Sequence, residues 1–507
     1  MTDLQLAGPA PTSRPAPTPR PAPTSRPARA HGPGTQPPEQ AGRAARDRSG
    51  LLLALILTGQ FMAVLDVAIV NVAVPTIRLD LHASGAGLQL VIAGYTIAYA
   101  VLLITGARLG ARFGHRPLFQ AGLAVFTAGS LACGLAQDTG SLIAFRVLQG
   151  VGSALMVPQV MSLIQKTFTG AARARALGIY TAVLAGATVV GQILGGVLVG
   201  ADLFGSGWRP VFLVNVPIGV LLLVAGHWTL PRLPVDRERR FDLLGLVVLA
   251  LAIGLLVVPL VLGHDLGWPR WTWAAMAGSV LAFGLFVLVE RRIAARGGQP
   301  LIHGRVLRSP GLLPASVGIF VVMLNFSGFM FSFALHLQAG LGDSPLRAGL
   351  LFGPIALGFG VFGLYWQRLP ERLHPSLPVA ALLVVALGYL AVGQLMRSGG
   401  QLGIATAVLL VVGAASGCAY SPLFARALSR VAPADAPDAS GVLVTMVQLG
   451  QVVGVSLVGT VFLSSVHYPA SAAVSGRALA VTTAVLAVSS VVAAGFASRT
   501  RRAATLG

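Results

Sequence analysis

The chain has 507 residues, of which 55% are hydrophobic and 10% charged, with a formal net charge of +20 and a mean hydropathy of +0.79. Soluble proteins carry about a quarter charged residues, so this chain has too few charges to cover the surfaces of several soluble domains. This excludes an ordinary soluble enzyme. It also argues against nucleic-acid binding, because the basic residues lie between apolar runs instead of gathering on one patch.

Residues 1–50 differ in composition from everything that follows. They are rich in proline and arginine and contain a near repeat, Pro11–Pro17 against Pro23–Arg29. Such a segment cannot bury apolar area, so we expect a disordered tail with polyproline character. It has no apolar core and is not expected to be a cleaved signal peptide. A plain solvated tail and a docking arm for a proline-binding module or anionic lipid are the two alternatives.

Long apolar runs make up the rest of the chain. A membrane-spanning helix needs about 20 mostly apolar residues, whereas the strands of an outer-membrane barrel are short and alternate in polarity. The runs here are long and continuous, so they predict an all-α membrane protein. Fourteen spans are expected, near residues 51–77, 87–107, 117–136, 141–165, 175–200, 208–230, 242–263, 271–290, 311–337, 346–367, 376–396, 402–424, 441–465 and 477–498.

The distribution of arginine and lysine predicts the orientation of these spans. With the N-terminus inside, 29 of the 36 basic residues fall in inside segments and 6 in outside loops, while Arg146 lies within a span. Basic residues favour the cytoplasmic side of a membrane. We therefore expect a multi-pass protein of the cytoplasmic membrane with both termini in the cytoplasm, and this arrangement also explains the high net charge.

Five stretches of sequence, taken in order, resemble the motifs of one family. They are Leu65–Pro75 in the first predicted span, Gly106–Arg116 after the second, Arg146–Gly152 in the fourth, a glycine-rich stretch in the fifth, and Trp208–Gly219 at the start of the sixth. Together they resemble the major facilitator superfamily. The first and last are similar to its fourteen-span drug:proton antiporter branch, and the resemblance covers roughly residues 51–498.

The resemblance implies a major facilitator fold with two six-helix bundles and two extra helices between them. A weak echo of the loop Arg112-x-x-x-Arg116 in Arg368-x-x-x-Arg372 fits repeated halves, which many secondary transporters have. The expected domains are a tail at 1–50, an N-terminal bundle at 51–230, an inserted pair at 242–290, a C-terminal bundle at 311–498 and a cytoplasmic tail at 499–507.

Asp66 and Arg146 are the main candidates for chemistry. Asp66 is the only carboxylate well inside a predicted span, because Glu290 ends the eighth. A charge at mid-helix costs about 2.5–3.5 kcal/mol to insert. A desolvated carboxylate near a cation can take and release protons, and the resemblance implies a proton-coupling acid in this motif. Arginine does not usefully deprotonate, so Arg146 is expected to stabilise the ionised carboxylate. The alternatives are a structural aspartate and a fixed ion pair.

The positions of these two residues along their spans predict that they meet. Asp66 lies roughly 22 Å from the inner end of its span, and Arg146 lies roughly 8 Å from the outer end of a span that runs the other way. In a hydrocarbon core about 30 Å thick, both therefore lie in the outer half at a similar depth. Pairing lowers the cost of both charges, so we expect direct contact or contact through one water.

The loop after the second span resembles the cytoplasmic gate motif of the family. Its residues are Gly106, Arg112, Gly114 and Arg116. Glycines permit close approach and a tight turn, and the arginines can bind helix C-terminal carbonyls and carboxylates across the seam between the halves. Ala111 stands where the family usually has an aspartate, so a charge-locked gate is not expected here. Plain cytoplasmic basic residues are the alternative.

The fifth span resembles the antiporter motif. The residues assigned to it are Gly178, Gly191, Gln192, Gly195 and Gly196. Small residues four apart let two helices touch backbone to backbone. Ala187 and Gln192 depart from the glycine and the proline of the motif, and without that proline a kink has no evident cause. Plain packing glycines are an equal alternative.

A substrate surface is indicated only weakly. Aromatic side chains with a few amides suit a flat lipophilic ligand, although such residues also occur in cores and against lipid. The candidates are Tyr95, Tyr99, Gln149, Asn325, Phe329 and His336.

No enzyme motif is present in the sequence. The chain lacks a Gly-Lys-Ser/Thr phosphate loop, so ATP is not the expected energy source, and neither a metal-binding cluster nor any cofactor is expected. Cys133 and Cys418 both lie inside apolar runs and are expected to be small buried side chains.

The sequence therefore predicts a transporter that exports lipophilic small molecules, such as drugs or antibiotics, in exchange for protons. Its expected partners are its substrate, protons and membrane lipid, without nucleic acid, and a monomer is expected. One alternative is a dedicated exporter of a single endogenous metabolite or self-made antibiotic. A transport-inactive membrane sensor or scaffold is another, but it has no need to bury Asp66 and Arg146 in spans.

Overall fold

The computed structural model describes residues 38–202, 205–235, 243–298, 300, 304–397, 402–429, 431, 436–466 and 471–505. Within these ranges the chain is helical with short turns, and no strand occurs. The chain divides into two units, 1–48 and 49–507. Residues 1–37 of the predicted tail lie outside the described ranges.

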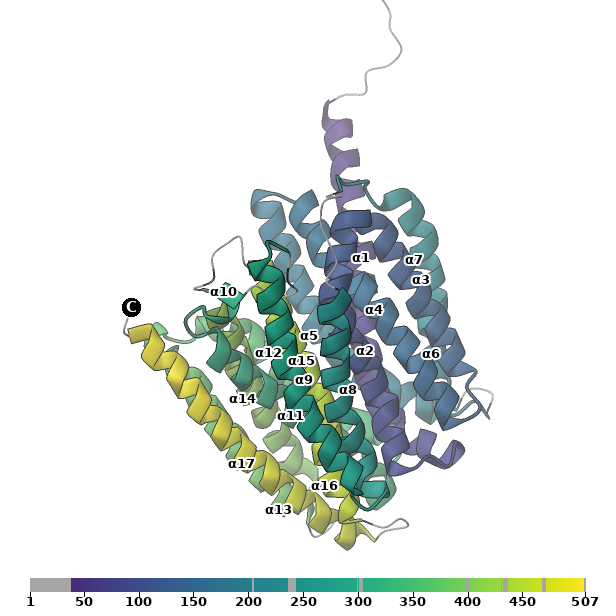
Figure 1. The fold of residues 1–507 in the computed structure, drawn as a ribbon. Helices are drawn as coiled ribbons and strands as arrows, with labels where there is room; N and C mark the ends of the chain where they lie inside the picture. Colours follow the sequence, from purple (N-terminus) through teal and green to yellow (C-terminus); the bar gives the residue numbers. More distant parts are fainter. Residues whose placement is uncertain are drawn as a thin grey trace, which may run out of the picture. The chain divides into compact units, whose positions relative to one another are not determined.

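The helices follow one another with short connections (Figure 1). In chain order they are α1 (Pro38–Asp80), α2 (Gly85–Phe113), α3 (His115–Gly134), α4 (Thr139–Thr167), α5 (Gly170–Ala201), α6 (Pro210–Leu213), α7 (Asn215–Thr229), α8 (Leu243–Asp265), α9 (Arg270–Ala295), α10 (Gly304–Leu307), α11 (Leu312–Leu335), the π-helical turn η2 (His336–Gly340), α12 (Pro345–Tyr365), the 3-10 turns η3 (Trp366–Arg368) and η4 (Glu371–Leu373), α13 (Leu377–Met396), α14 (Leu402–Ser429), α15 (Ala436–Val453), the π-helical turn η5 (Gly454–Val458), α16 (Gly459–Ser464) and α17 (Ala472–Thr505). Helix α1 begins inside the predicted N-terminal tail, and α17 continues into the predicted C-terminal one.

Polar caps fix where several of these helices begin. The Ser84 hydroxyl accepts from the N–H of Gly87 at 3.0 Å at the start of α2, and Asp138 accepts from Ser141 N–H at 2.9 Å at the start of α4. Ser344 caps α12 in the same way. Each cap satisfies a backbone donor that the first helical turn leaves free. The capping residues lie in the short connections between helices, so the local sequence helps to fix where these helices begin.

Thirteen helical segments among the described residues are long and apolar enough to cross a membrane. The fourteenth predicted span corresponds to α5, which is continuous over 32 residues, although its described part contributes only the shorter apolar stretch Gly186–Ala201. At 1.5 Å per residue a helix of this length exceeds a hydrocarbon core of about 30 Å. The prediction of a multi-pass membrane protein is confirmed.

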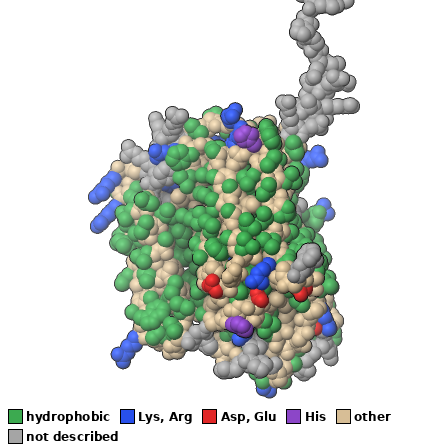
Figure 2. Space-filling view, turned by 90° about the vertical axis from the view of Figure 1, so that its right-hand side faces the viewer, with side chains coloured by type: hydrophobic (Ala, Val, Ile, Leu, Met, Phe, Trp, Pro, Cys, Tyr) green, Lys and Arg blue, Asp and Glu red, His purple; other side chains and the backbone are tan. Residues whose placement is uncertain are grey.

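Large apolar side chains stand exposed on the outer faces of the helices. Leu281 on α9, Leu387 on α13 and Val488 on α17 are 75%, 68% and 66% exposed. Figure 2 shows a face on which hydrophobic side chains form a broad belt, with most Lys and Arg side chains toward its two ends. Exposing such a belt to water would cost free energy, whereas exposing it to lipid hydrocarbon does not. The backbone is satisfied inside each helix, as the hydrocarbon region requires.

The helices form two bundles of six spans with an added pair. In the first bundle α4 packs against α2 and α3, and in the second α13 and α11 pack against α17, while α12 packs against α14. The bundles meet where α5 contacts α12 and where α2 contacts α15. The added pair, α8 and α9, covers the second of these seams, since Ile253 of α8 belongs to one apolar cluster with Val101 of α2 and Leu449 of α15. The exact domain boundaries given above stay a prediction.

Candidate functional site

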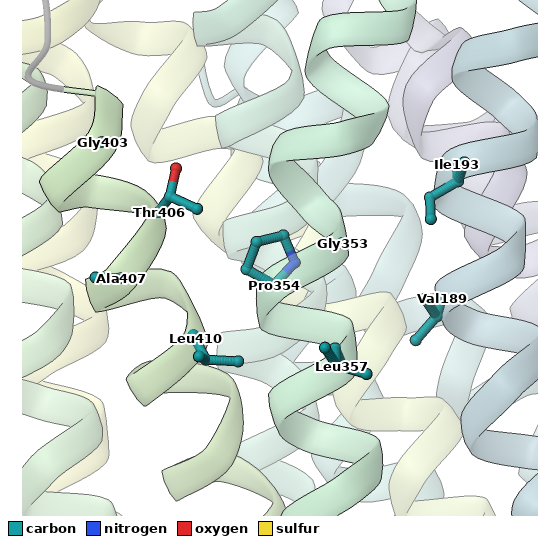
Figure 3. A pocket seen from close by; sticks show the side chains of 9 residues that line it. All are labelled: Val189, Ile193, Gly353, Pro354, Leu357, Gly403, Thr406, Ala407 and Leu410. Atoms are coloured by element: carbon teal, nitrogen blue, oxygen red, sulfur yellow. The ribbon is translucent and has the colours of Figure 1, made fainter.

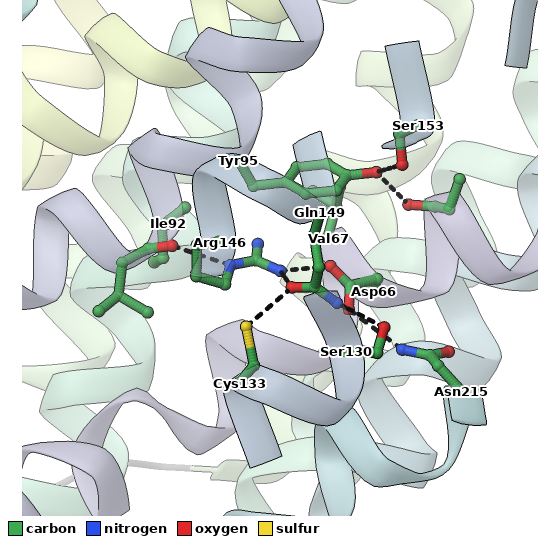
Figure 4. Close-up of polar contacts among 12 residues, drawn as sticks. Asp66, Val67, Ile92, Tyr95, Ser130, Cys133, Arg146, Gln149, Ser153 and Asn215 are labelled. Atoms are coloured by element: carbon green, nitrogen blue, oxygen red, sulfur yellow. Dashed lines mark hydrogen bonds and ion pairs between the residues drawn. The ribbon is translucent and has the colours of Figure 1, made fainter. Parts of the chain in front are cut away.

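Three side chains from two helices of the first bundle gather around the buried carboxylate of Asp66 (Figure 4). Asp66 comes from α1, Arg146 and Gln149 from α4, and Asn215 from the first residue of α7. Each is at most 1% exposed. Arg146 and Gln149 are three residues apart and so lie on one face of α4.

The carboxylate of Asp66 receives a hydrogen bond from each of these neighbours. Arg146 Nη1 forms an ion pair with Asp66 Oδ2. Gln149 Nε2 and Asn215 Nδ2 both donate to Asp66 Oδ1, at 3.1 and 3.2 Å. The expected approach of Asp66 and Arg146 is thus observed as a direct contact. All the partners are N–H donors, so the arrangement fits an ionised carboxylate.

A second set of contacts fixes the orientation of Gln149. Its Nε2 also donates to Ser130 Oγ at 2.7 Å, and its Oε1 accepts from Arg146 Nη1 at 2.9 Å and from the Cys133 thiol at 3.3 Å. Sequence reasoning assigned Gln149 to the substrate surface. The structure places its amide beside both charges, bonded at one end to Asp66 and at the other to Arg146.

The Arg146 guanidinium is held on its other sides by α2 and by aromatic rings. Its Nε donates to the carbonyl of Val91 at 3.0 Å, and its Cζ lies 4.6 Å from the centre of the Tyr95 ring and 5.6 Å from that of Phe212. The Tyr95 hydroxyl contacts Ser153 Oγ at 2.7 Å and donates to Ala63 O at 3.1 Å. A desolvated cation gains from aromatic faces, so the positive charge has its own stabilisation and does not depend on Asp66 alone.

Sequence reasoning missed three members of this network: Asn215, Ser130 and Cys133. Asn215 lies inside the Trp208–Gly219 motif, and an amide within an apolar run is a signal that could have singled it out, because a buried polar group needs partners. Ser130 and Cys133 carry no comparable signal, since small side chains of this kind occur throughout apolar helices.

Close packing and turn geometry explain the two glycines of the predicted gate loop. A Cβ on Gly106 would lie 2.0 Å from the backbone oxygen of Ala154 in α4. Gly114 joins α2 to α3 with φ +104°, a conformation that favours glycine. Its N–H bonds to Gly110 O at 2.9 Å and so closes α2.

The arginines of the loop find partners that the sequence did not specify. Arg116 donates to the carbonyl of His227 near the C-terminus of α7, which is the expected kind of acceptor but lies in the same bundle. The Arg112 guanidinium lies over the Phe113 ring at 5.6 Å. Arg108 donates to the carbonyl of Pro300 and so links α2 to the segment between α9 and α10. Ala111 is buried, so an aspartate there would have to be desolvated.

A chain of hydrogen bonds, also missed, runs from the buried side chains of His115 and Gln159 to the exposed Lys166 and ties this loop to α4. His115 Nδ1 contacts Gln159 Oε1 at 2.8 Å, and Lys166 Nζ contacts His115 Nε2 at 3.0 Å. Because the ammonium can only donate, Nε2 accepts and Nδ1 carries the hydrogen. Gln159 Nε2 donates onward to Gly106 O at 2.9 Å. The sole lysine of the chain thus helps to position the loop.

The glycines of α5 divide between two partners. Cβ atoms on Gly191 and Gly195 would lie 2.8 Å from Ala68 Cβ and 2.9 Å from Ile69 O, both in α1. A Cβ on Gly196 would lie 2.7 Å from the carbonyl oxygen of Pro345 in α12. The motif therefore brings α5 against α1 within the first bundle and against α12 of the second.

Gly178 and Gln192 of the same motif differ from these three glycines in their surroundings. A Cβ on Gly178 would meet nothing within 4 Å, so close packing does not require glycine there. Gln192 is 1% exposed, and its Oε1 has no hydrogen-bond partner among the described residues. Ala187 is fully buried.

The remaining substrate candidates are not brought to one place. Tyr99 pairs with Tyr95, their ring centres 6.1 Å apart. In the second bundle Asn325 donates to Ser490 Oγ in α17 at 2.8 Å, Phe329 stacks on Phe333, and His336 Nδ1 contacts Ser475 Oγ in α17 at 2.9 Å. These three pack α11 and η2 within their own bundle.

An apolar groove of about 500 Å³ lies between α5, α12 and α14 (Figure 3). It contains none of the six substrate candidates, and Thr406 contributes its one side-chain hydroxyl. Its lining residues are Val189, Ile193, Gly353, Pro354, Leu357, Gly403, Thr406, Ala407 and Leu410. Several of them are exposed on the outer surface, so the groove opens toward the surroundings of the bundle.

The sequence as a whole matches the family model of the Major Facilitator Superfamily over residues 56–242 and 234–455. The chain belongs to this superfamily. It is 38% identical over 450 residues to a probable actinorhodin transporter of Streptomyces coelicolor, an alignment that covers 87% of this chain and 76% of that protein. It is 37% identical over 419 residues to a cephamycin export protein of Amycolatopsis lactamdurans, covering 81% of this chain and 84% of that protein.

Among solved structures, this superfamily member is similar to a bacterial homologue of the human lysosomal transporter Spinster. The TM-score is 0.66 at 20% identity, and the match covers 90% of this chain and 97% of the other. Such a likeness establishes the fold. The family and the transporter relatives show that the chain is a transporter of small molecules and not an enzyme. The buried network around Asp66 lies in the first bundle of the fold.

Proposed function

We propose that this transporter exports lipophilic small molecules, drugs or antibiotics, across the cytoplasmic membrane in exchange for protons. The observation that carries the proposal is the network of Asp66, Arg146, Gln149 and Asn215, buried at membrane depth in a chain related to antibiotic exporters. Burying a charge pair in a membrane costs free energy, so its presence points to a functional role.

In the proposed mechanism Asp66 carries the proton. A proton from outside neutralises the carboxylate and breaks its ion pair with Arg146, the two bundles rock about a central substrate site, and the proton leaves to the inside. Arg146 keeps its charge throughout and stabilises the ionised form again. Each proton bound on one side is released on the other, while the substrate moves in the opposite direction.

A dedicated exporter of one endogenous metabolite or self-made antibiotic is the second candidate. It is favoured by the names of the two relatives, each of which refers to a single antibiotic. A transport-inactive sensor or scaffold is less well supported, because Asp66 and Arg146 would then be buried without purpose.

A resistance panel in a pump-deficient host separates these candidates. We expect resistance to several unrelated lipophilic compounds, together with efflux of a lipophilic dye that stops when a protonophore collapses the gradient. Resistance to one compound class alone would favour the dedicated exporter. Efflux that is insensitive to the protonophore would refute proton coupling, and the same host with Asp66→Asn supplies the matched control.

The proposal includes a cytoplasmic location for both termini. Reporter fusions should read inside at positions 112, 170, 236 and 300 and outside at positions 138, 205, 267 and 342. The fusion at 267 is the most informative, since it lies between α8 and α9. An inside reading there would contradict the placement of the added pair.

We also propose that the protein works as a monomer in contact with lipid. Size-exclusion chromatography in detergent with light-scattering detection measures the mass of the protein and so tests this.

A further inference from the structure

Among the described partners of Asp66, Asn215 has an amide of which only one end is hydrogen-bonded. Its Nδ2 donates to Asp66 Oδ1 at 3.2 Å, whereas its own Oδ1 is buried and has no hydrogen-bond partner among the described residues. A buried acceptor without a donor is costly and calls for an explanation. The amide is 1% exposed, so bulk water does not supply one.

Protonation of Asp66 changes which hydrogen-bond partners the carboxyl group needs. The ionised carboxylate only accepts, but a protonated one carries an O–H that needs an acceptor. Arg146 has only donors and cannot provide one. The other titratable groups near the carboxylate are the Tyr95 hydroxyl, which is bonded to Ser153 and Ala63, and the Cys133 thiol, which is bonded to Gln149.

Gln149 cannot turn to meet the new proton. Its Oε1 already accepts from Arg146 and Cys133, and its Nε2 also donates to Ser130. Rotation of this amide would set its NH₂ group against the guanidinium. Asn215 has no such second contact through its oxygen, so rotation of its amide by half a turn costs one bond and forms another.

We infer that Asn215 is a positioning residue whose amide rotates when Asp66 is protonated and so accepts the new O–H. With the carboxylate ionised, Nδ2–H donates to Asp66 Oδ1. When a proton binds Oδ1, that bond breaks, the amide turns, and the new O–H donates to Asn215 Oδ1. Gln149 continues to donate to the same carboxyl oxygen. This inference rests on the proposed role of Asp66 in proton coupling.

The place of Asn215 in the fold suits this role. It is the first residue of α7, which continues from α6 as one span, Pro210–Thr229, because Val214 between them keeps helical dihedral angles of φ −58° and ψ −28°. Pro217 follows two residues later and cannot donate to the carbonyl one turn earlier. A change of bonding at Asn215 therefore acts within one turn of the carbonyl of Leu213, which the proline leaves without its helical N–H donor.

Infrared difference spectra of the purified full-length protein in liposomes, recorded between high and low pH, test the inference directly. The C=O band of protonated Asp66 is identified by its loss in Asp66→Asn. In Asn215→Leu, which keeps the shape but removes both polar groups, we expect this band at higher frequency because the carboxylic acid has lost its acceptor. Asn71→Leu is the matched control: Asn71 is a buried amide on α1 that bonds to Val67 O in its own helix. It should leave the band in place.

Efflux driven by a pH gradient gives a second measurement. A charge-assisted hydrogen bond is worth about tenfold or more in an equilibrium, so Asn215→Leu should slow efflux by about that factor. Asn215→Thr carries a hydroxyl that can donate or accept, and it should restore most of the rate and the position of the infrared band.

An Asp66 band at the same frequency in Asn215→Leu and in the wild type would overturn the inference and leave the proton-coupling role of Asp66 intact. An equal loss of efflux in Asn215→Leu, Asn215→Thr and Asn71→Leu would also overturn it, since the effect would then be one of packing. Absence of any band that depends on Asp66 would refute both the inference and the proposed coupling.

Discussion

Asp66→Asn is expected to reduce pH-gradient-driven efflux to background while the protein still inserts in the membrane. Asparagine has the same shape and can stay in contact with Arg146, but it cannot take up a proton. Substrate exchange at equal pH on both sides should persist, because it needs the rocking of the bundles and no net proton movement. Dye efflux and substrate counterflow in proteoliposomes measure the two activities separately.

Asp138→Asn is the matched control for this change. Asp138 caps α4 outside the spans, and the hydrogen bond from the N–H of Ser141 lowers the pKa of its carboxyl. Asparagine is an equally good cap, so this variant should transport at the wild-type rate. Wild-type efflux by Asp66→Asn would contradict the coupling role, whereas loss of both efflux and counterflow would point to a structural role.

Gly106→Ala is expected to prevent correct folding of the first bundle. The added Cβ would lie 2.0 Å from the backbone oxygen of Ala154. A backbone atom cannot move aside as a flexible side chain can, so α2 and α4 would have to separate along much of their contact. Overpacking usually costs about 1–3 kcal/mol, and more where the neighbour is rigid. The yield of monodisperse protein and its thermal unfolding measure the effect.

Gly178→Ala supplies the comparison on α5. A Cβ there would meet nothing within 4 Å, and alanine favours a helix over glycine by about 1 kcal/mol. This variant should therefore be as stable as the wild type or more so. Equal stability of the two alanine variants would show that the close contact of Gly106 with α4 can relax.

The multi-pass helical architecture and the contact between Asp66 and Arg146 could be predicted from the sequence. Continuous apolar runs have to become helices in a membrane, since the backbone must satisfy its own hydrogen bonds there. The depths of Asp66 and Arg146 follow from helix rise alone, and the high cost of a lone buried charge makes their pairing the favourable outcome. For this reason the contact between them could be anticipated without any knowledge of the packing.

The partners of the pair were decided by the tertiary structure. A helix that is apolar all round, such as α11, gives no periodic signal of which face turns inward, so Asn325 and His336 could not be assigned to contacts with α17. Gln149 and Asn215 reach the same carboxyl oxygen only because α4 and α7 pack beside α1 at particular rotations. Helix rise along the chain fixes depth in the membrane, whereas rotation about each helix axis depends on how neighbouring side chains interlock, and that is settled only when the bundles assemble.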